Sequence, residues 1–194
     1  RAEEAEAAYQ HAMALEPANP AAPLNLGALL FSAGRLAEAE TWIRKALALE
    51  PAMVEARVNL CFTLLAQGRL REAWPLHDAR ADIARQKAQT HWPDLPMPHW
   101  RGEPLAGKSL MIWPEQGYGD YIQFVRLVQT LKARGASRIT LVCAPPLHAL
   151  LQTMAGVDQV VSGVADVPPH DYWAFVLGLA QGLDLDLPDI PAEL

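Results

Sequence analysis

The sequence predicts an α + α/β protein: an α-helical repeat domain over residues 1–90, joined by a linker over 91–107 to a parallel-sheet α/β domain over 108–194. Three observations lead to this prediction. The first half of the chain matches itself at one fixed shift, which brings Leu26 onto Leu60. The linker region is rich in Pro and Trp. Beyond it, short apolar segments alternate with amphipathic ones, which indicates strands and helices in turn.

The repeat is defined by small and apolar residues that recur in one register. In one unit these residues are Leu26, Gly27, Leu30, Gly34, Ala39, Ile43, Ala46 and Pro51. The forward shift brings them onto Leu60, Cys61, Leu64, Gly68, Ala73 and His77, and the reverse shift onto Ala5, Tyr9, Ala12 and Pro17. A period of about 34 residues, with small residues at helix crossings and a closing proline, is typical of tetratricopeptide repeats. We therefore expect an α-solenoid of about 2.5 repeats.

The predicted helix boundaries follow from glycine and alanine positions. Gly34 and Gly68 end the first helix of each pair, because glycine adopts the left-handed conformation after a helix without a Cβ clash. Ala39 and Ala46 lie on one face of the second helix, where a short side chain lets its partner approach closely. Residues 3–16 correspond to the second helix of a repeat, so we expect the native protein to continue upstream.

Two asparagines at equivalent repeat positions are candidate binding residues. Asn25 and Asn59 each precede the Leu that packs the helix pair, although mid-helix Asn is disfavoured by about 0.5 kcal/mol relative to Ala. The resemblance to tetratricopeptide repeats implies that this position faces the concave surface, where amides can form hydrogen bonds with the backbone of an extended peptide. The alternative is that each amide forms a hydrogen bond within its own repeat. Both interpretations remain open at this point.

The repeat pattern weakens after Ala73. Pro75 lies where a helix interior is expected, which predicts a kink or an early helix end. Residues 80–91 have a helical pattern. In the linker, Trp92 and Trp100 are expected to pack against the domains rather than to bind a ligand.

The second half predicts alternating strands and helices. The predicted strands are 109–115, 138–144, 159–163 and 171–178, and the predicted helices are 121–134, ended by Gly135, and 146–154. Such an order implies a parallel sheet with right-handed crossovers, in which ligands bind at the carboxyl ends of the strands. The loop EQGYGD, residues 115–120, is therefore the candidate site.

This loop does not match a dinucleotide-binding motif. Gly117 and Gly119 fit the first two glycines of G-x-G-x-x-G, but Ile122 occupies the third position. Asp120 would also compete with a phosphate at the start of the following helix.

Composition excludes several other function classes. The formal net charge is −6, and no block of Lys or Arg indicates binding to nucleic acid or to an anionic membrane. No apolar run is long enough to span a membrane, so we expect a cytoplasmic protein. The sequence has no spacing typical of a metal site or of a nucleophilic hydrolase, and Cys61 and Cys143 are expected to be buried thiols.

The segment from Trp100 to Leu151 resembles the start of the catalytic region in bacterial tetratricopeptide proteins of the GT-B glycosyltransferase type. These are similar in layout to O-linked N-acetylglucosamine transferase and, in their first α/β domain, to heptosyltransferases. The most specific motif is E-Q-G-x-G-D-x-I-Q-F-x-R, matched by Glu115, Gln116, Gly117, Gly119, Asp120, Ile122, Gln123, Phe124 and Arg126. Leu127 replaces a usual aromatic residue.

The resemblance implies that residues 108–194 are a Rossmann-like, acceptor-binding half of a GT-B fold. By this resemblance Asp120 is a candidate general base and Glu115 a weaker catalytic candidate. The loop residues Gln116, Gly117, Tyr118 and Gly119 would then contact the acceptor. The alternative for Asp120 is a helix N-cap without catalytic function.

Two functions follow as hypotheses. The first is a repeat scaffold that binds a protein or peptide, fused to the acceptor-side domain of a glycosyltransferase whose acceptor is a glycan or a protein. The donor half is absent from this chain, so we expect no cofactor here and no activity of the chain alone; a nucleotide sugar would be the donor of the full-length enzyme. The second is a non-catalytic adaptor in which the α/β domain caps the repeats.

Overall fold

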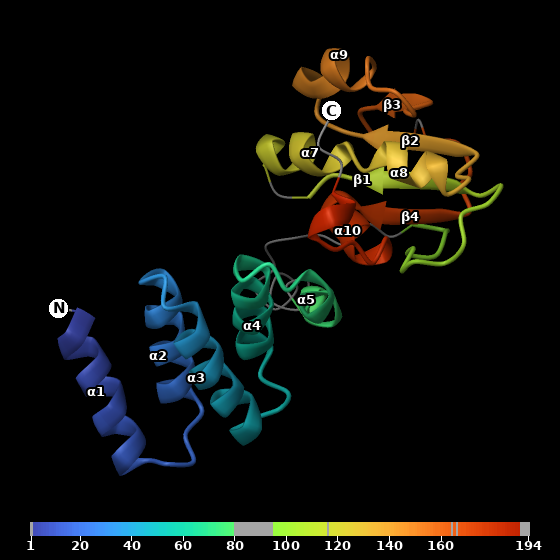
Figure 1. Cartoon of the computed structure of the whole chain (residues 1–194). Coiled ribbons are helices and arrows are strands. Elements are labelled where there is room, and N and C mark those ends of the chain that lie inside the picture. Colours follow the sequence, from blue (N-terminus) through green and yellow to red (C-terminus); the bar gives the residue numbers. More distant parts are fainter. Residues whose placement is uncertain (1, 80–94, 116, 164, 166, 191–194) are drawn as a thin grey trace. The chain divides into compact units, whose positions relative to one another are not determined.

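The computed structural model describes residues 2–79, 95–115, 117–163, 165 and 167–190. The chain divides into two compact units, Arg1–Trp92 and Pro93–Leu194 (Figure 1). The boundary between them falls inside the linker predicted at 91–107.

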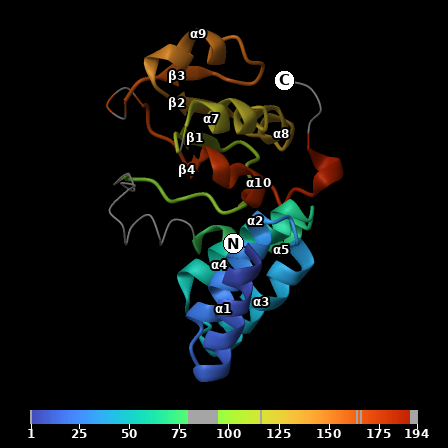
Figure 2. The ribbon, with the colours of Figure 1, turned by 90° about the vertical axis from the view of Figure 1, so that its left-hand side faces the viewer.

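The first unit is built from antiparallel helices. They are α1 (Ala2–Leu15), α2 (Ala21–Ser32), α3 (Leu36–Leu49), α4 (Val54–Ala66) and α5 (Leu70–His77). Each helix packs against the next one along the chain (Figure 2). The shared core contains the small and apolar residues that defined the sequence repeat, among them Leu26, Leu30, Ala39, Ile43, Ala46, Leu60 and Leu64.

The turns within the helix pairs have the predicted glycine conformation. Gly34 and Gly68 both have φ of +75°. The amide N–H of Arg35 donates to Leu30 O and that of Arg69 to Leu64 O, both at 2.9 Å. These bonds complete the Schellman motif that ends a helix. The predicted helix ends at both glycines are confirmed.

A third glycine permits the close crossing of α2 and α3. A Cβ atom added at Gly27 would lie 2.5 Å from Ile43 Cγ1 and 3.1 Å from Ala39 O. Ala39, Ile43 and Ala46 are fully buried at this crossing. The predicted role of small residues in the repeat is therefore confirmed, with Gly27 at the tightest contact.

The helix α5 is shorter than the other repeat helices. It contains Pro75 and ends at His77, in agreement with the predicted early helix end. The predicted helical stretch 80–91 lies outside the described residues, as does Trp92.

A ladder of ion pairs, not anticipated from the sequence, links successive repeats. Arg35 contacts Glu6 on α1 at 2.8 Å, and Arg69 contacts Glu40 on α3 at 2.6 Å. Each arginine also pairs with the glutamate three residues later, Glu38 or Glu72. The two sets occupy equivalent positions of successive repeats. Because each arginine lies in a turn and contacts the preceding helix pair, the ladder joins one repeat to the next.

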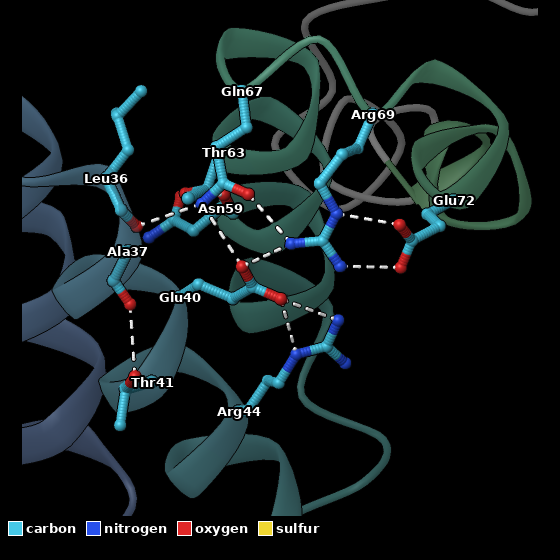
Figure 3. Close-up of polar contacts among 10 residues, drawn as sticks. All are labelled: Leu36, Ala37, Glu40, Thr41, Arg44, Asn59, Thr63, Gln67, Arg69 and Glu72. Atoms are coloured by element: carbon cyan, nitrogen blue, oxygen red, sulfur yellow. Dashed lines mark hydrogen bonds and ion pairs between the residues drawn. The ribbon is translucent and has the colours of Figure 1, made fainter.

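Glu40 is the most enclosed member of this ladder. Its side chain is 14% exposed, against 37% for Arg69. As Figure 3 shows, its carboxylate also accepts hydrogen bonds from Arg44 Nε at 2.9 Å and Gln67 Nε2 at 3.1 Å. Burial alone would raise the pKa of Glu40, but the hydrogen bonds from Arg44, Gln67 and Arg69 outweigh it and hold that pKa below its usual range.

Replacing Glu40 by Gln should lower the free energy of unfolding at pH 7 by about 1–3 kcal/mol, because charged partners lose their carboxylate acceptor. Because the pKa of Glu40 is lower in the folded than in the unfolded protein, where it is about 4.3, its carboxylate stabilises the fold at pH values above the unfolded pKa. This stabilisation is lost as the pH falls through the folded pKa. The difference between the two proteins should therefore shrink below about pH 4.

Urea unfolding followed by circular dichroism at pH 7 and at pH 3 measures this effect. The control is Glu55→Gln, at an exposed glutamate on α4. Equal destabilisation by the two substitutions at pH 7 would contradict the role given to Glu40.

The second unit contains a four-stranded parallel sheet with strand order β3-β2-β1-β4. Its strands are β1 (Ser109–Trp113), β2 (Arg138–Val142), β3 (Gln159–Val161) and β4 (Tyr172–Phe175). Its helices are α7 (Tyr118–Val125), α8 (Val128–Ala133), η1 (Pro145–Leu147), α9 (His148–Leu151), η3 (Val176–Gly178), α10 (Leu179–Gly182) and η4 (Leu187–Asp189). The predicted strand–helix alternation and parallel sheet are confirmed.

The observed structure differs in two ways from the single helix predicted over 121–134. The helical segment begins earlier, at Tyr118, and it is divided into α7 and α8. The division follows from a tightened turn in which Leu127 N donates to Phe124 O, three residues back. This turn keeps Val125 and Val128 fully buried on the two sides of the break. Gly135 has φ of +92° and ends the second helix, as predicted.

The described part of the predicted linker packs onto the second unit. Trp100 N donates to Trp173 O at 2.7 Å, so this segment runs along β4. The Trp100 ring is buried, and its Nε1 donates to Glu103 O at 2.8 Å. The expected packing role of Trp100 is confirmed. The free thiols of Cys61 and Cys143 are buried, also as predicted.

Candidate functional site

The carboxyl ends of β1 and β4 form the switch point of the sheet. From β1 the chain continues to β2 and β3 on one side, whereas β4 pairs with β1 on the other side. Loops that leave such neighbouring strands diverge and leave a crevice, in which ligands of open α/β sheets bind. Here α7, which follows β1, lies against η3, which follows β4. The loop predicted as the site is therefore at this switch point.

The structure places the candidate residues along the loop and the first turn of α7. Glu115 is buried two residues beyond the end of β1, with 9% exposure. Gly117 is the N-cap residue of α7. Tyr118, exposed to 53%, and Gly119 open the helix, and Asp120 is half-buried in its first turn. Gln116 lies outside the described residues.

The position of Asp120 corrects two expectations. We expected Asp120 to precede the helix, but α7 begins at Tyr118 and includes it. The N-cap alternative is also wrong, because Gly117 occupies that position with extended backbone, φ −87° and ψ 173°. Asp120 is the third helical residue, where the positive end of the helix dipole favours a carboxylate.

Tyr121 holds this end of α7 against the sheet. Its ring is almost fully buried and its Oη donates to Val142 O, the last residue of β2, at 3.0 Å. Burial raises the pKa of the Tyr121 phenol well above its usual range. Because Tyr121 fixes the first turn, the adjacent Asp120 has a defined position at the carboxyl edge of the sheet.

The two loop glycines are not required for a tight turn. Neither Gly117 nor Gly119 has a positive φ, and a Cβ added at either would meet no atom within 4 Å. The backbone conformation therefore does not explain why glycine occupies these two positions. Their effect is to leave open space on both sides of Tyr118, and a bound group has room there.

The first unit contains a hollow of about 140 Å³ between α2 and α4. Its lining residues are Ala28, Phe31 and Ser32 from α2, Ile43 from α3, and Asn59, Phe62 and Thr63 from α4. Asn59 is half-buried at this hollow, whereas Asn25 is exposed on α2 and is not among the lining residues. The structure therefore places one of the two predicted amides at the hollow.

The side-chain amides of Asn25 and Asn59 make no hydrogen bond to the part of the chain that the structure describes. The Asn59 main-chain carbonyl accepts a bond from Thr63 Oγ1 at 2.7 Å, but this bond does not involve the amide. The alternative of an amide bond within each repeat is therefore not seen among these residues.

Sequence reasoning missed the aromatic residues at this hollow. Phe31 is 37% exposed and Phe62 is 47% exposed. Both are apolar residues on the otherwise exposed face of a helix. This departure from the amphipathic pattern is the sequence feature that could have indicated a binding surface.

Neither a metal centre nor a membrane span is found within the described ranges. In them, no group of three or more His, Cys, Asp and Glu side chains is arranged to hold a metal ion. None of the helices in the same residues is long and apolar enough to cross a membrane.

Residues 1–46 match the family model of the tetratricopeptide repeat. Over these residues, which include α1, α2 and most of α3, the first unit is similar to a tetratricopeptide repeat. No curated protein matches the chain significantly.

Among solved structures, the chain is similar to a point mutant of the O-GlcNAc transferase of Thermobaculum terrenum, with 19% sequence identity and a TM-score of 0.31. The match covers 84% of this chain and 38% of that structure's chain. This chain therefore spans well under half the length of that protein. A likeness at this level establishes no activity for the second unit.

Proposed function

We propose that the chain is a protein-interaction scaffold whose repeats bind an extended peptide through Asn25 and Asn59. The observation that carries this proposal is the Asn59 amide, which lines the hollow between α2 and α4 and has no hydrogen-bond partner among the described residues. A polar group in a partly buried position gains more from a hydrogen bond than one in open water.

A side-chain amide suits a peptide main chain. It offers both N–H donors and a carbonyl acceptor, so it pairs with the amide group of any residue. The two amides occupy the same position of successive repeats, on the corresponding helices α2 and α4. An extended chain that passes over α2 and α4 would meet one amide from each repeat.

Replacing both Asn25 and Asn59 by Ala should weaken peptide binding by about 1–3 kcal/mol, since each lost hydrogen bond accounts for about 0.5–1.5 kcal/mol. The probe is an uncharged peptide amide, Gly-Ser-Thr-Ser-Phe-Ser-Thr-Ser-Gly, titrated into ¹⁵N-labelled protein and followed by NMR. The dissociation constant and the shifted amide signals are read from the same spectra.

The control for this pair is Gln10→Ala, which removes an exposed amide from α1. Circular dichroism checks that the double variant remains folded. Unchanged affinity of the double variant, with the wild-type pattern of shifted signals, would refute the proposal.

The second candidate function is sugar transfer, with the second unit as the acceptor-side half of a GT-B glycosyltransferase. The observation that favours it is the placement of Asp120 at the switch point. The strand order β3-β2-β1-β4 is that of the first four strands of a Rossmann fold. In this proposal Asp120 accepts the acceptor's hydroxyl proton, Glu115 is a second carboxylate, and Tyr118 with its flanking glycines contacts the acceptor.

In the same proposal the donor is a nucleotide sugar, which residues outside this chain would bind. The protein would act in the cytoplasm. The competing adaptor function predicts no chemical role for Asp120. Substitution of Asp120 by Asn separates the two functions.

A further inference from the structure

We propose that the hollow between α2 and α4 is a specificity pocket that accepts one uncharged, apolar side chain of the bound peptide. This inference rests on the proposed peptide-binding function and adds the chemical class of the ligand. It concerns residues that the proposed amide contacts do not use, chiefly Phe31 and Phe62.

The size of the hollow fits one side chain. Its volume is about 140 Å³. An apolar protein cavity of about 150 Å³ is large enough to bind benzene. A phenylalanine or leucine side chain therefore fits the space, whereas two side chains do not.

The hydroxyl groups around the hollow are already paired. Ser32 Oγ donates to Ala28 O at 3.0 Å, and Thr63 Oγ1 donates to Asn59 O at 2.7 Å. Both hydroxyl donors are therefore used by their own helices. The Asn59 amide is left to interact with a ligand, and the remaining lining from Ala28, Phe31, Ile43 and Phe62 is apolar.

The charge of the surroundings selects against an ionised side chain. None of the lining residues is ionisable, and α2, with the sequence AAPLNLGALLFS, carries no charge along its length. A lysine or aspartate side chain would lose hydration against two phenyl rings, and no charged side chain lines the hollow to compensate that loss. Electrostatic complementarity therefore requires a neutral occupant.

Asn59 and Phe62 are spaced so that one peptide residue can contact both, Asn59 through its main chain and Phe62 through its side chain. They are three residues apart on α4, so they are neighbours on one face, with Cβ atoms about 5–6 Å apart. In an extended peptide a side chain stands roughly perpendicular to its own main chain. A residue whose amide pairs with Asn59 can thus place its side chain beside Phe62.

The experiment varies the central residue of the host peptide named above among Phe, Leu, Ala, Lys and Asp. We expect Phe and Leu to bind at least about tenfold more tightly than Ala, Lys and Asp, and to shift the signals of Phe31 and Phe62. In Phe62→Ala protein this preference should disappear while the Ala peptide keeps its affinity. Leu15→Ala, at a 69% exposed leucine on α1, is the matched control.

A second variant, Ala28→Leu, tests the pocket without removing an aromatic ring. It fills the hollow from α2 and should abolish the preference for Phe and Leu.

Equal affinities for all five peptides, still dependent on Asn25 and Asn59, would overturn the pocket and leave the peptide-binding function standing. A preference that survives both Phe62→Ala and Ala28→Leu would overturn the pocket as well. Absence of binding by every peptide would overturn both proposals.

Discussion

Under the proposed glycosyltransferase function, Asp120→Asn should reduce sugar transfer by about 10²–10⁴-fold and change the free energy of unfolding by less than about 1 kcal/mol. Asparagine keeps the size of the side chain but cannot accept a proton as a general base does. The structural contribution of Asp120 is limited to a carboxylate in the first turn of α7, because Gly117 is the N-cap residue. Loss of that charge at a helix N-terminus accounts for about 0.3–1 kcal/mol.

The measurement uses the longest protein product that contains this chain, with turnover and thermal unfolding determined on the same sample. The control is Gln129→Ala, at an exposed residue of α8 beyond the first turn of α7. Wild-type turnover in Asp120→Asn would leave Asp120 as a helix-dipole residue only. Unfolding of the variant would assign it a structural role. Either outcome would favour the adaptor function.

Gly182→Ala should destabilise the second unit by about 2–3 kcal/mol. A Cβ atom at Gly182 would lie 2.4, 2.8 and 2.9 Å from three atoms of the Trp100 ring. The ring is held by the hydrogen bond from its Nε1 to Glu103 O. The Gly182 backbone is also closely packed against Gly102, where an added Cβ would lie 2.8 Å from Gly182 O. Overpacking is therefore relieved only by displacing Trp100.

Gly119→Ala is the matched control for Gly182→Ala. Both glycines lie in helices of the same unit, but a Cβ at Gly119 meets no atom within 4 Å. Alanine there should raise stability by about 0.5–1 kcal/mol, since glycine is the poorer helix former. Hydrogen exchange of the β1 and β2 amides reports this unit separately from the repeats. Equal effects of the two substitutions would contradict the packing argument.

The helices and turns of the repeats were predictable because their causes are local. Gly34 and Gly68 end helices through a backbone conformation that glycine adopts readily, and this requirement can be read from the residue itself. The apolar stripe through Leu26 and Leu30 likewise reflects the helical period. The strand–helix alternation of the second unit was predictable for the same reason.

The local pattern did not predict the start of α7, whose first turn is held by a contact distant in sequence. The bond from Tyr121 Oη to Val142 O joins the helix to a strand about 20 residues away. The local signal, a Gly-x-Gly-Asp run, favoured a turn up to Asp120 and placed the helix start three residues too late. Whether a carboxylate there caps the helix or faces a ligand depends on this start.

The ion-pair ladder also could not be predicted from the sequence. The sequence contains its period, since Glu6 and Arg35 recur as Glu40 and Arg69. The period alone does not predict that each arginine pairs with a glutamate of the preceding repeat. The two partners are 29 residues apart and meet only when the helices pack.

Hydrophobic period, glycine positions and the repeat register thus sufficed to predict the paired helices of the first unit and the α/β class of the second, because each of these signals acts over a few residues or recurs along the chain. The hollow between α2 and α4, the Asn59 amide beside it and the place of Asp120 inside the first turn of α7 required the folded chain. They arise from residues that are distant in sequence, and packing alone brings such residues together.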